Sequence, residues 1–345
     1  KTKKIKRKKA LLYLHCGCKV NQYETNAMRQ KFIENGYEIV EFEEKADIYI
    51  INTCTVTNMS DRKSRQIIRR VKDINKSAIL AVTGCYAQVA KDELDKIEDI
   101  DIVIGNIEKK DVVKTVENFI KTNKKENIVS DIMKEKYVAE FEVAAYTEKT
   151  RAVVKVQDGC DRFCSYCIIP YARGRVRSRS VQEIVNEITE ISKQGIKEVV
   201  ITGIHIASYG KDFKEDIGLI DLLKEINKIE GIKRIRLGSI EPTLIDEKFI
   251  KELVKLEKIC DHFHLSLQSG CDETLKRMNR RYTTKEFENC TNLIKNNYPN
   301  VALTTDIIVG FPGETKKEFL ETYQYLDKID FYKMHIFKYS PRKGT

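Results

Sequence analysis

Short apolar segments alternate with amphipathic helical segments along most of this chain, and this alternation limits the possible folds more than any other feature. In the first third, β-rich segments are separated by stretches with helical periodicity; the β-rich segments are residues 10–15, 37–42, 46–52, 77–84 and 99–106. Apolar strands joined by helices are typical of βαβ units and of a parallel sheet that is covered on both faces. We therefore expect residues 9–122 to form a doubly wound α/β domain.

A second alternation begins after a polar stretch, residues 123–150, which we interpret as a linker that includes one strand. The β-rich segments of the second alternation are residues 152–157, 197–203, 234–240, 262–268, 301–310 and 332–339. Six strands with intervening helices fit an open or partial (β/α)6 barrel better than a closed eight-fold barrel, and we assign it residues 151–345. Ser180 is the expected N-cap of the first barrel helix, and Gly195 is the expected stop.

The composition narrows the class of protein. The chain has 62 Lys and Arg against 52 Asp and Glu, a formal net charge of +10. Such a charge favours an anionic partner such as nucleic acid, although an enzyme with a lysine-rich surface is equally compatible. No apolar run approaches the roughly 20 residues that span a bilayer, and the basic start does not resemble a secretory signal. We expect a cytoplasmic protein, in which ten cysteines indicate metal binding or catalysis rather than disulfides.

Three cysteines with C-x₃-C-x₂-C spacing follow the first predicted barrel strand. They are Cys160, Cys164 and Cys167, here called the barrel trio. A structural zinc site usually needs four ligands, and no fourth cysteine or histidine follows nearby. An iron–sulfur cluster on three cysteines would leave one iron open for a substrate or cofactor. Three buried structural thiols are the remaining alternative.

A second group of cysteines is dispersed in the first domain. Cys18, Cys54 and Cys85, here called the sheet trio, each follow a predicted parallel strand. The carboxyl ends of such strands meet at one edge, where open α/β sheets bind ligands. We therefore expect the sheet trio to form a second metal site. The remaining cysteines match neither pattern and are interpreted as buried or structural thiols: Cys16, Cys260, Cys271 and Cys290.

The segment "GCDRFCSYC" resembles the radical S-adenosylmethionine (SAM) enzymes. From about Leu14 onward the chain resembles the methylthiotransferases, through the segments "GCKVNQYET", "NTCTVT", "GCYAQ", "IPYARGRVRSR", "SIEP", "LSLQSGCDETLKRMNRRY" and "DIIVGFPGET". "GCKVNQYET" is most similar to the branch that acts on threonylcarbamoyladenosine in tRNA. Members usually carry a C-terminal TRAM domain, a small RNA-binding β-barrel. We expect none in these residues, because the sequence stops at "YSPRKGT", about where that domain would begin.

The resemblance implies two 4Fe–4S clusters. The barrel trio would hold the one that binds SAM and cleaves it to a 5′-deoxyadenosyl radical, which removes the hydrogen at C2 of the modified adenine. The sheet trio would hold an auxiliary cluster that donates sulfur, and a second SAM would supply the methyl group. The implied function is methylthiolation of N6-threonylcarbamoyladenosine next to the anticodon. The implied partners are tRNA and an electron donor such as flavodoxin or ferredoxin, and we expect a monomer.

The rest of the SAM site is expected at the carboxyl ends of the barrel strands. The small or polar residues at those ends are Thr202, Gly203, Ser239, Glu241, Gln268, Ser269, Asp306 and Gly310. Tyr166 lies where the superfamily commonly places an aromatic ring beside the adenine. Any of these residues could instead be a cap or turn residue. We favour Glu241 and Gln268, and leave the role of His205 open.

A row of arginines follows the barrel trio: Arg173, Arg175, Arg177 and Arg179. In an extended segment this spacing directs them to one side, where they could neutralise the phosphates of an anticodon loop or contact the SAM carboxylate. A basic helix face in the first domain could also contact RNA or could simply be solvated; it comprises Arg62, Lys63, Arg65, Arg69 and Arg70.

Two other functions use parts of the same apparatus. The first is methylthiolation of a different substrate, either isopentenyladenosine in tRNA or a side chain of a ribosomal protein; the net positive charge and the form of "GCKVNQYET" argue against the protein substrate. The second is a non-catalytic electron carrier or zinc-stabilised RNA-binding module. Six cysteines at two strand edges and a complete SAM-type barrel exceed what that role needs.

Overall fold

The computed structural model describes residues 9–14, 18–41, 44–138 and 150–345 of the chain. Cys16 and part of the expected linker therefore lie outside the described residues. The chain divides into two compact units, and the short segment Tyr171–Arg175 belongs to the first unit although the flanking residues belong to the second. The expected α/β class, with one doubly wound sheet and one partial barrel, is confirmed. Among the described residues, no helix has the length and apolar character of a membrane span.

The first unit is built on a six-stranded parallel sheet in the order β2-β1-β3-β4-β5-β6. Its strands are β1 (Lys9–Leu14), β2 (Glu38–Ile39), β3 (Ile48–Thr53), β4 (Ile79–Gly84), β5 (Ile102–Ile104) and β6 (Glu126–Ile128). Its α-helices are α1 (Lys19–Glu34), α2 (Asn58–Ile74), α3 (Cys85–Val89), α4 (Lys91–Asp95) and α5 (Val112–Thr122). The 3-10 turns are η1 (Glu108–Asp111) and η2 (Ile132–Lys134).

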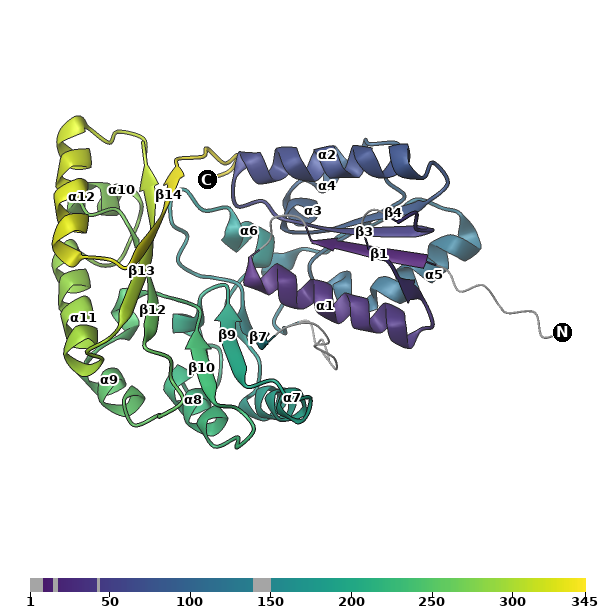
Figure 1. Ribbon diagram of the computed structural model, residues 1–345. Coiled ribbons are helices and arrows are strands. Elements are labelled where there is room, and N and C mark those ends of the chain that lie inside the picture. The colour runs from purple at the N-terminus through teal and green to yellow at the C-terminus, as the bar shows by residue number, and fades with distance from the viewer. Residues whose placement is uncertain (1–8, 15–17, 42–43, 139–149) are drawn as a thin grey trace. The chain divides into compact units, whose positions relative to one another are not determined.

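Helices α1 and α2 cover opposite faces of this sheet (Figure 1). The central strand β3 is buried along its whole length, as expected for a strand that is covered on both sides. One side of the sheet packs on Ile68 and Val71 of α2. Buried residues of α1, among them Met28 and Phe32, face the other side. The apolar run at residues 46–52 thus gives a central strand because neither of its faces meets water.

The second unit is an open barrel of parallel strands with helices outside it (Figure 1). Its strands are β7 (Arg151–Asp158), β9 (Glu198–Gly203), β10 (Arg234–Leu237), β11 (Ser239–Ile240), β12 (His262–Gln268), β13 (Ala302–Val309) and β14 (Lys333–Lys338), with the two-residue antiparallel β8 (Arg177–Ser178) beside β7. The helices are α7 (Val181–Lys193), α8 (Leu219–Asn227), α9 (Glu247–Leu253), α10 (Asp272–Arg277), α11 (Thr284–Asn297) and α12 (Lys316–Ile329). Helix α6 (Ile169–Arg173) begins in this unit, and its last three residues belong to the first unit. The 3-10 turns are η3 (Ile206–Ser208) and η4 (Pro242–Leu244).

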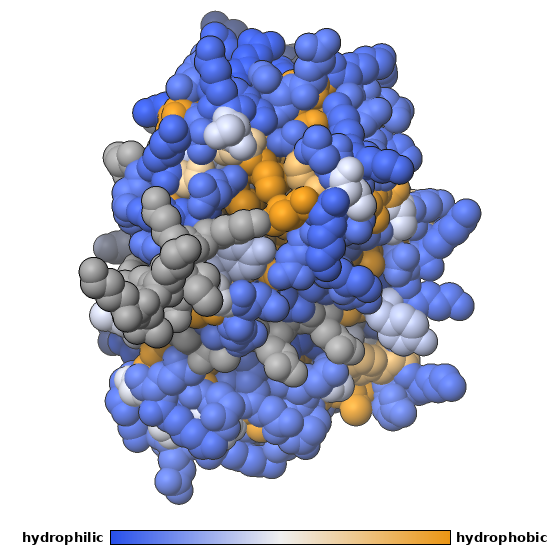
Figure 2. Space-filling model, turned by 90° about the vertical axis from the view of Figure 1, so that its right-hand side faces the viewer, coloured by the Kyte–Doolittle hydropathy of each residue, from blue (hydrophilic) through white to orange (hydrophobic). Residues whose placement is uncertain are grey.

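The predicted limits of the first barrel helix are confirmed. Ser180 caps α7 in a reciprocal capping box with Glu183, and Gly195 follows the helix with a φ of +87°. The strand expected in residues 234–240 is divided at Gly238 into β10 and β11. The face shown in Figure 2 is mainly hydrophilic, with hydrophobic side chains in a few areas, as expected for a chain with 33% charged residues.

Candidate functional site

The sheet trio gathers at the carboxyl edge of the first sheet. Cys54 directly follows β3, Cys85 directly follows β4, and Cys18 directly precedes α1. The side-chain oxygen of Asn21 is 3.9 Å from the Cys18 sulfur and 4.0 Å from the Cys85 sulfur, so one amide links two of the three thiols. Burial raises the pKa of Cys54 to about 12, and the neighbouring Cys85 and Cys18 add to this rise. The three cysteines share one edge of the sheet, as inferred from the sequence, and their thiols lie close enough to interact electrostatically.

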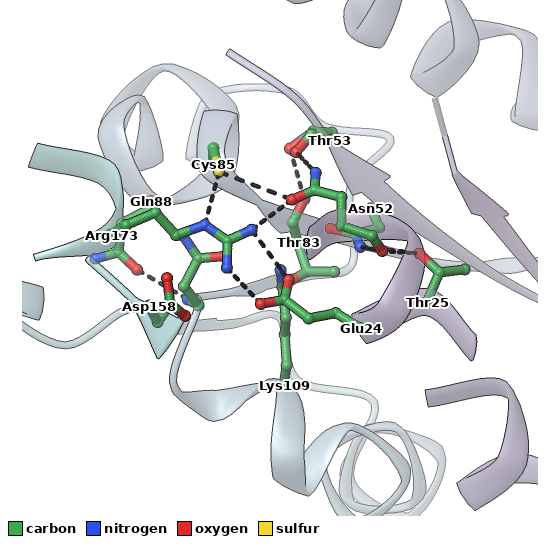
Figure 3. A network of polar contacts seen from close by, with 12 residues as sticks. Glu24, Thr25, Asn52, Thr53, Thr83, Cys85, Gln88, Lys109, Asp158 and Arg173 are labelled. Carbon is green, nitrogen blue, oxygen red and sulfur yellow. Dashed lines mark hydrogen bonds and ion pairs between the residues drawn. The ribbon is translucent and has the colours of Figure 1, made fainter. Parts of the chain in front are cut away.

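Hydrogen bonds fix the backbone around the sheet trio. The Asn21 amide donates to the Thr53 carbonyl at 3.0 Å, and the Asn52 amide donates in return to the Asn21 carbonyl at 3.1 Å. The Thr53 hydroxyl donates to the Thr83 carbonyl at 2.5 Å. These bonds join α1, β3 and β4 close to the cysteines, as Figure 3 shows for the side chains of Asn52, Thr53 and Thr83. Because they are buried, their loss would leave unpaired polar groups in the interior.

Gly84 lets the ends of β3 and β4 lie close together just before the two buried cysteines, Cys54 and Cys85. Its φ is +100°, and a Cβ atom there would lie 2.2 Å from the Thr53 carbonyl oxygen. We expect Gly84→Ala to displace β3 or β4 and to cost about 1–3 kcal/mol of unfolding free energy beyond the backbone strain, together with loss of bound iron. Gly36→Ala is the matched control, because Gly36 has a φ of +83° but no atom within 4 Å of its Cβ position. Thermal unfolding and iron analysis of both variants test this; equal losses would contradict it.

The cysteine loop of the second unit is held by the last residue of α10 and the residues that follow it. Phe163 adopts a φ of +47°, and its carbonyl accepts a hydrogen bond of 3.0 Å from the Asn279 amide. The Ser165 backbone N–H donates to the Met278 carbonyl at 3.1 Å, and the Ser165 hydroxyl donates to the Arg277 carbonyl at 2.7 Å. The clamp joins residues more than 100 positions apart in the chain. Sequence reasoning did not identify Arg277, Met278 or Asn279 individually, although the segment "LKRMNRRY" contains them.

Arg280 lies beside the thiols of the barrel trio. Its guanidinium donates to the Cys164 sulfur at 3.3 Å and to the Ser266 carbonyl at 3.1 Å, and it stacks on the Tyr282 ring at 4.8 Å. Burial raises the pKa of Cys160 to about 11 and that of Cys167 to about 12. A cation or a metal beside such a thiol favours the thiolate. Arg280 was not predicted from the sequence.

Glu241 is the centre of a buried polar group at the carboxyl end of β11. Only 3% of the residue is exposed. One carboxylate oxygen lies 2.7 Å from Nε2 of His205 and pairs with Arg162 of the cysteine loop, and the other lies 4.0 Å from Arg280. Burial raises the pKa of Glu241, but the hydrogen bond from His205 and the charges of His205, Arg280 and Arg162 outweigh burial and hold the pKa at about 2. His205, left open by the sequence, thus lies beside a predicted site residue.

Three of the other residues expected to bind SAM have side-chain partners: Tyr166, Asp306 and Ser269. Tyr166 packs edge-on against Phe311 with ring centroids 6.4 Å apart, and Asp306 lies 3.1 Å from Nε2 of His264. Ser269 is fully buried, and its hydroxyl is 3.1 Å from that of Thr322 in α12. Four of the remaining positions lie at or next to the carboxyl ends of strands: Thr202 is buried, Gly203 packs against Gln157, and Gln268 and Gly310 each have a φ of +71°. Ser239 is exposed and begins β11.

The arginine row does not form one cationic face. Arg173 is fully buried and belongs to the first unit, whereas Arg177 is 2% exposed and lies 3.9 Å from Asp158. Arg179 pairs with Glu187 at 2.6 Å and donates to the Lys155 carbonyl. Arg175 is exposed. The assumption of a continuous extended segment was wrong, because Arg173 ends helix α6 and Arg177 starts strand β8.

The basic face that was expected on a helix of the first unit is largely present on α2. Four of the five basic residues are exposed on α2: Arg62, Lys63, Arg69 and Arg70. Arg65 instead donates to the Tyr86 hydroxyl at 2.8 Å, next to Cys85 in the chain. The helix therefore presents a basic surface to solvent.

The described residues contain no group of three or more His, Cys, Asp or Glu side chains arranged to hold one metal ion. In a cubane cluster each cysteine binds a different iron, so the cysteines lie farther apart than the ligands of one ion. Two sets of three thiols, each with an arginine donating to one sulfur, fit the donor chemistry of such clusters.

Two family models match the chain. Residues 154–326 match the radical SAM superfamily, and residues 11–105 match the uncharacterized protein family UPF0004. The chain is 46% identical over 329 residues to "Threonylcarbamoyladenosine tRNA methylthiotransferase MtaB" of Aquifex aeolicus, covering 95% of the chain and 80% of that protein. The protein of the same name from Bacillus subtilis is also 46% identical, with 73% of it covered. The "tRNA-2-methylthio-N(6)-dimethylallyladenosine synthase" of Thermoanaerobacter sp. is 36% identical, with 97% of the chain and 72% of that protein covered.

Solved structures support the fold. The radical SAM methyltransferase TsrM from Kitasatospora setae superposes with a TM-score of 0.68 at 15% identity, covering 95% of the chain and 72% of TsrM. The radical SAM enzyme OxsB superposes with a TM-score of 0.61 at 13% identity, covering 93% of the chain and 52% of OxsB. At these identities the likeness concerns the fold alone.

Proposed function

This chain belongs to the radical SAM methylthiotransferase family, and on that basis we propose that it methylthiolates C2 of N6-threonylcarbamoyladenosine beside the anticodon of tRNA. The 46% identity to two proteins named for that substrate, against 36% to a dimethylallyladenosine synthase, supports this branch. We place the enzyme in the cytoplasm as a monomer, with flavodoxin or ferredoxin as its electron donor.

The observation that supports the proposal best is the pair of cysteine trios, each at the carboxyl end of parallel strands in its own unit. The barrel trio would hold the 4Fe–4S cluster that binds SAM, and the sheet trio would hold the auxiliary cluster. When bound, these groups supply the 5′-deoxyadenosyl radical, the sulfur and the methyl group. The chain itself must position the groups and exclude water from them.

The residues around the barrel trio can perform that positioning. Arg162, within the loop, is tied to Glu241 by an ion pair, and Arg280 joins the Cys164 sulfur to the β12 backbone. Tyr166 would lie beside the SAM adenine, and Thr202, Gly203, Ser239, Gln268, Ser269, Asp306 and Gly310 remain candidates for its other contacts. Arg175 and the exposed basic residues of α2 are the candidate contacts for tRNA phosphates.

The substrate branch is tested with undermodified tRNA. We expect the anaerobically reconstituted chain, with SAM and dithionite, to convert threonylcarbamoyladenosine in tRNA to its 2-methylthio derivative, measured by nucleoside mass spectrometry. tRNA that bears isopentenyladenosine is the parallel substrate, and we expect at least about tenfold less product from it, a factor that corresponds to roughly 1.4 kcal/mol of transition-state discrimination. Equal turnover, or a preference for isopentenyladenosine, would contradict the assigned branch while leaving the reaction class intact.

A further inference from the structure

A fully buried ionic network lies beside Cys85 in the first unit (Figure 3). Lys109 and Arg173 both pair with Glu24, and the Lys109 Nζ atom is 2.5 Å from the carboxylate. A second guanidinium nitrogen of Arg173 is 3.0 Å from Glu24 and also donates to the Asn21 side-chain oxygen. The Arg173 Nε–H donates to the Cys85 sulfur at 3.1 Å. The guanidinium is therefore fixed on one side by a carboxylate and directed on the other at a thiol.

The segment around Arg173 is anchored to the same unit. The Asn106 amide donates to the Ala172 carbonyl at 2.7 Å. Gly174 has a φ of +73°, and a Cβ atom there would lie 2.4 Å from the Ile132 carbonyl oxygen, so only glycine permits this close approach. Arg173 thus reaches Cys85 from a short, fixed segment on a side chain that has little freedom.

Burial makes the charges of this network sensitive to their partners. Glu24, Lys109 and Arg173 are each 0% exposed. Isolated buried charge is unfavourable, so each charged group needs an opposite charge close by. The Nε–H of Arg173 that donates to the Cys85 sulfur favours an anion at that atom, and a thiolate bound to iron would supply one.

We propose that Arg173 is a positioning residue for the auxiliary cluster, an inference that rests on the proposed binding of this cluster by the sheet trio. Its Nε–H orients the Cys85 thiolate and offsets the negative charge of the cluster, while Glu24 and Lys109 hold the guanidinium in place. Arginine suits this role because its planar fork donates to the carboxylate and to the sulfur at the same time, which the single ammonium of a lysine cannot do with the same geometry.

The test isolates the auxiliary cluster in the full chain. In a Cys160→Ala/Cys164→Ala/Cys167→Ala background, Arg173→Met, Arg173→Lys and the control Lys72→Met are reconstituted anaerobically. Lys72 belongs to the same unit and pairs with Asp101 at 3.3 Å, but it lies near Ala78, at the opposite end of β4 from Cys85. The readouts are the reduction potential of the cluster, by titration followed with electron paramagnetic resonance, and the rate of iron loss to a chelator.

We expect Arg173→Met to lower the reduction potential, because a cation and a donor to sulfur stabilise the reduced cluster, and to speed iron loss by about tenfold or more. Arg173→Lys, which keeps the charge, should fall between Arg173→Met and the arginine parent. Lys72→Met should match the parent in both readouts. Arg173→Met leaves Glu24 and Lys109 as a neutral pair, so we expect the variant to fold. If it does not fold, the inference is tested by comparing Arg173→Lys with the parent chain.

Three outcomes would contradict the inference, and each can be told apart from the others. If Arg173→Met, or Arg173→Lys where it must decide, lowers the melting temperature of the iron-free chain but leaves the potential and iron loss at the parent values, Arg173 is only a structural strut and the inference is overturned. If the background chain retains about four irons and the potential is insensitive to Arg173, this inference falls while the proposed function stands. If the background binds no iron, the second cluster of the proposed function falls with it.

Discussion

Replacing the sheet trio by alanine (Cys18→Ala/Cys54→Ala/Cys85→Ala) is expected to lower the iron content from about eight to about four atoms per chain, because each cubane contains four irons. Cleavage of SAM to 5′-deoxyadenosine should persist, since the cysteines of the barrel trio, their clamp at Ser165 and Arg280 all lie in the second unit. Methylthiolated tRNA should no longer form, because the sulfur donor is lost. Iron and sulfide analysis, with a dithionite-driven SAM cleavage assay, measures all three effects.

A matched control separates cluster loss from the loss of a buried thiol. Cys290 is buried in α11, and its pKa is raised to about 12 by burial, as for Cys54, but it belongs to neither trio. Cys290→Ala should keep about eight irons and full methylthiolation. About four irons in both the wild type and the triple variant would instead mean that the sheet trio is structural, and the sulfur-donor assignment would fall.

The sequence predicted the fold and the sheet trio for the same reason. Both depend on strand order along the chain and on the rule that parallel strands end at one edge, and this information is local. β3 was predictable because its residues are apolar without interruption. Cys54 and Cys85 followed from their positions one residue after β3 and β4. No tertiary contact had to be known for these conclusions.

The parts that could not be predicted depend on contacts between distant residues. Arg173 looked like one member of a cationic row, yet its partner Glu24 is 149 residues away, and no spacing in the sequence reveals such a pair. Alternating arginines indicate a common face only where the backbone is extended throughout. Here helix α6 ends at Arg173, so the rule did not apply. The contacts of His205 and Arg280 with Glu241 likewise join residues that are distant in the chain.

Glu241→Gln is expected to destabilise the second unit and to impair SAM cleavage, because Arg162, His205 and Arg280 would lose their common buried anion. The folded pKa of about 2 lies below the ordinary value of 4.5. A depressed carboxyl pKa contributes stability that is present above the unfolded pKa and is lost as the pH falls through the folded pKa, here on the order of 3 kcal/mol at pH 7. Urea unfolding should therefore show a large gap between wild type and variant above pH 4.5 that narrows toward pH 2.

Glu198→Gln is the control that separates the effect of losing Glu241 beside the barrel trio from the effect of losing any carboxylate that pairs with arginines. Glu198 pairs with Arg234 at 3.0 Å and Arg236 at 2.8 Å, but it starts β9, whereas Glu241 follows the carboxyl end of β11, and its side chain is 15% exposed against 2% for Glu241. Solvent screens such a pair, so we expect a cost of no more than about 1 kcal/mol and unchanged SAM cleavage. Glu241→Gln should slow SAM cleavage by about tenfold or more, because Arg162 and Arg280 adjoin the barrel trio. Equal cleavage rates in the two variants would reduce Glu241 to a structural ion-pair partner, since its position beside the barrel trio would then have no effect on the chemistry.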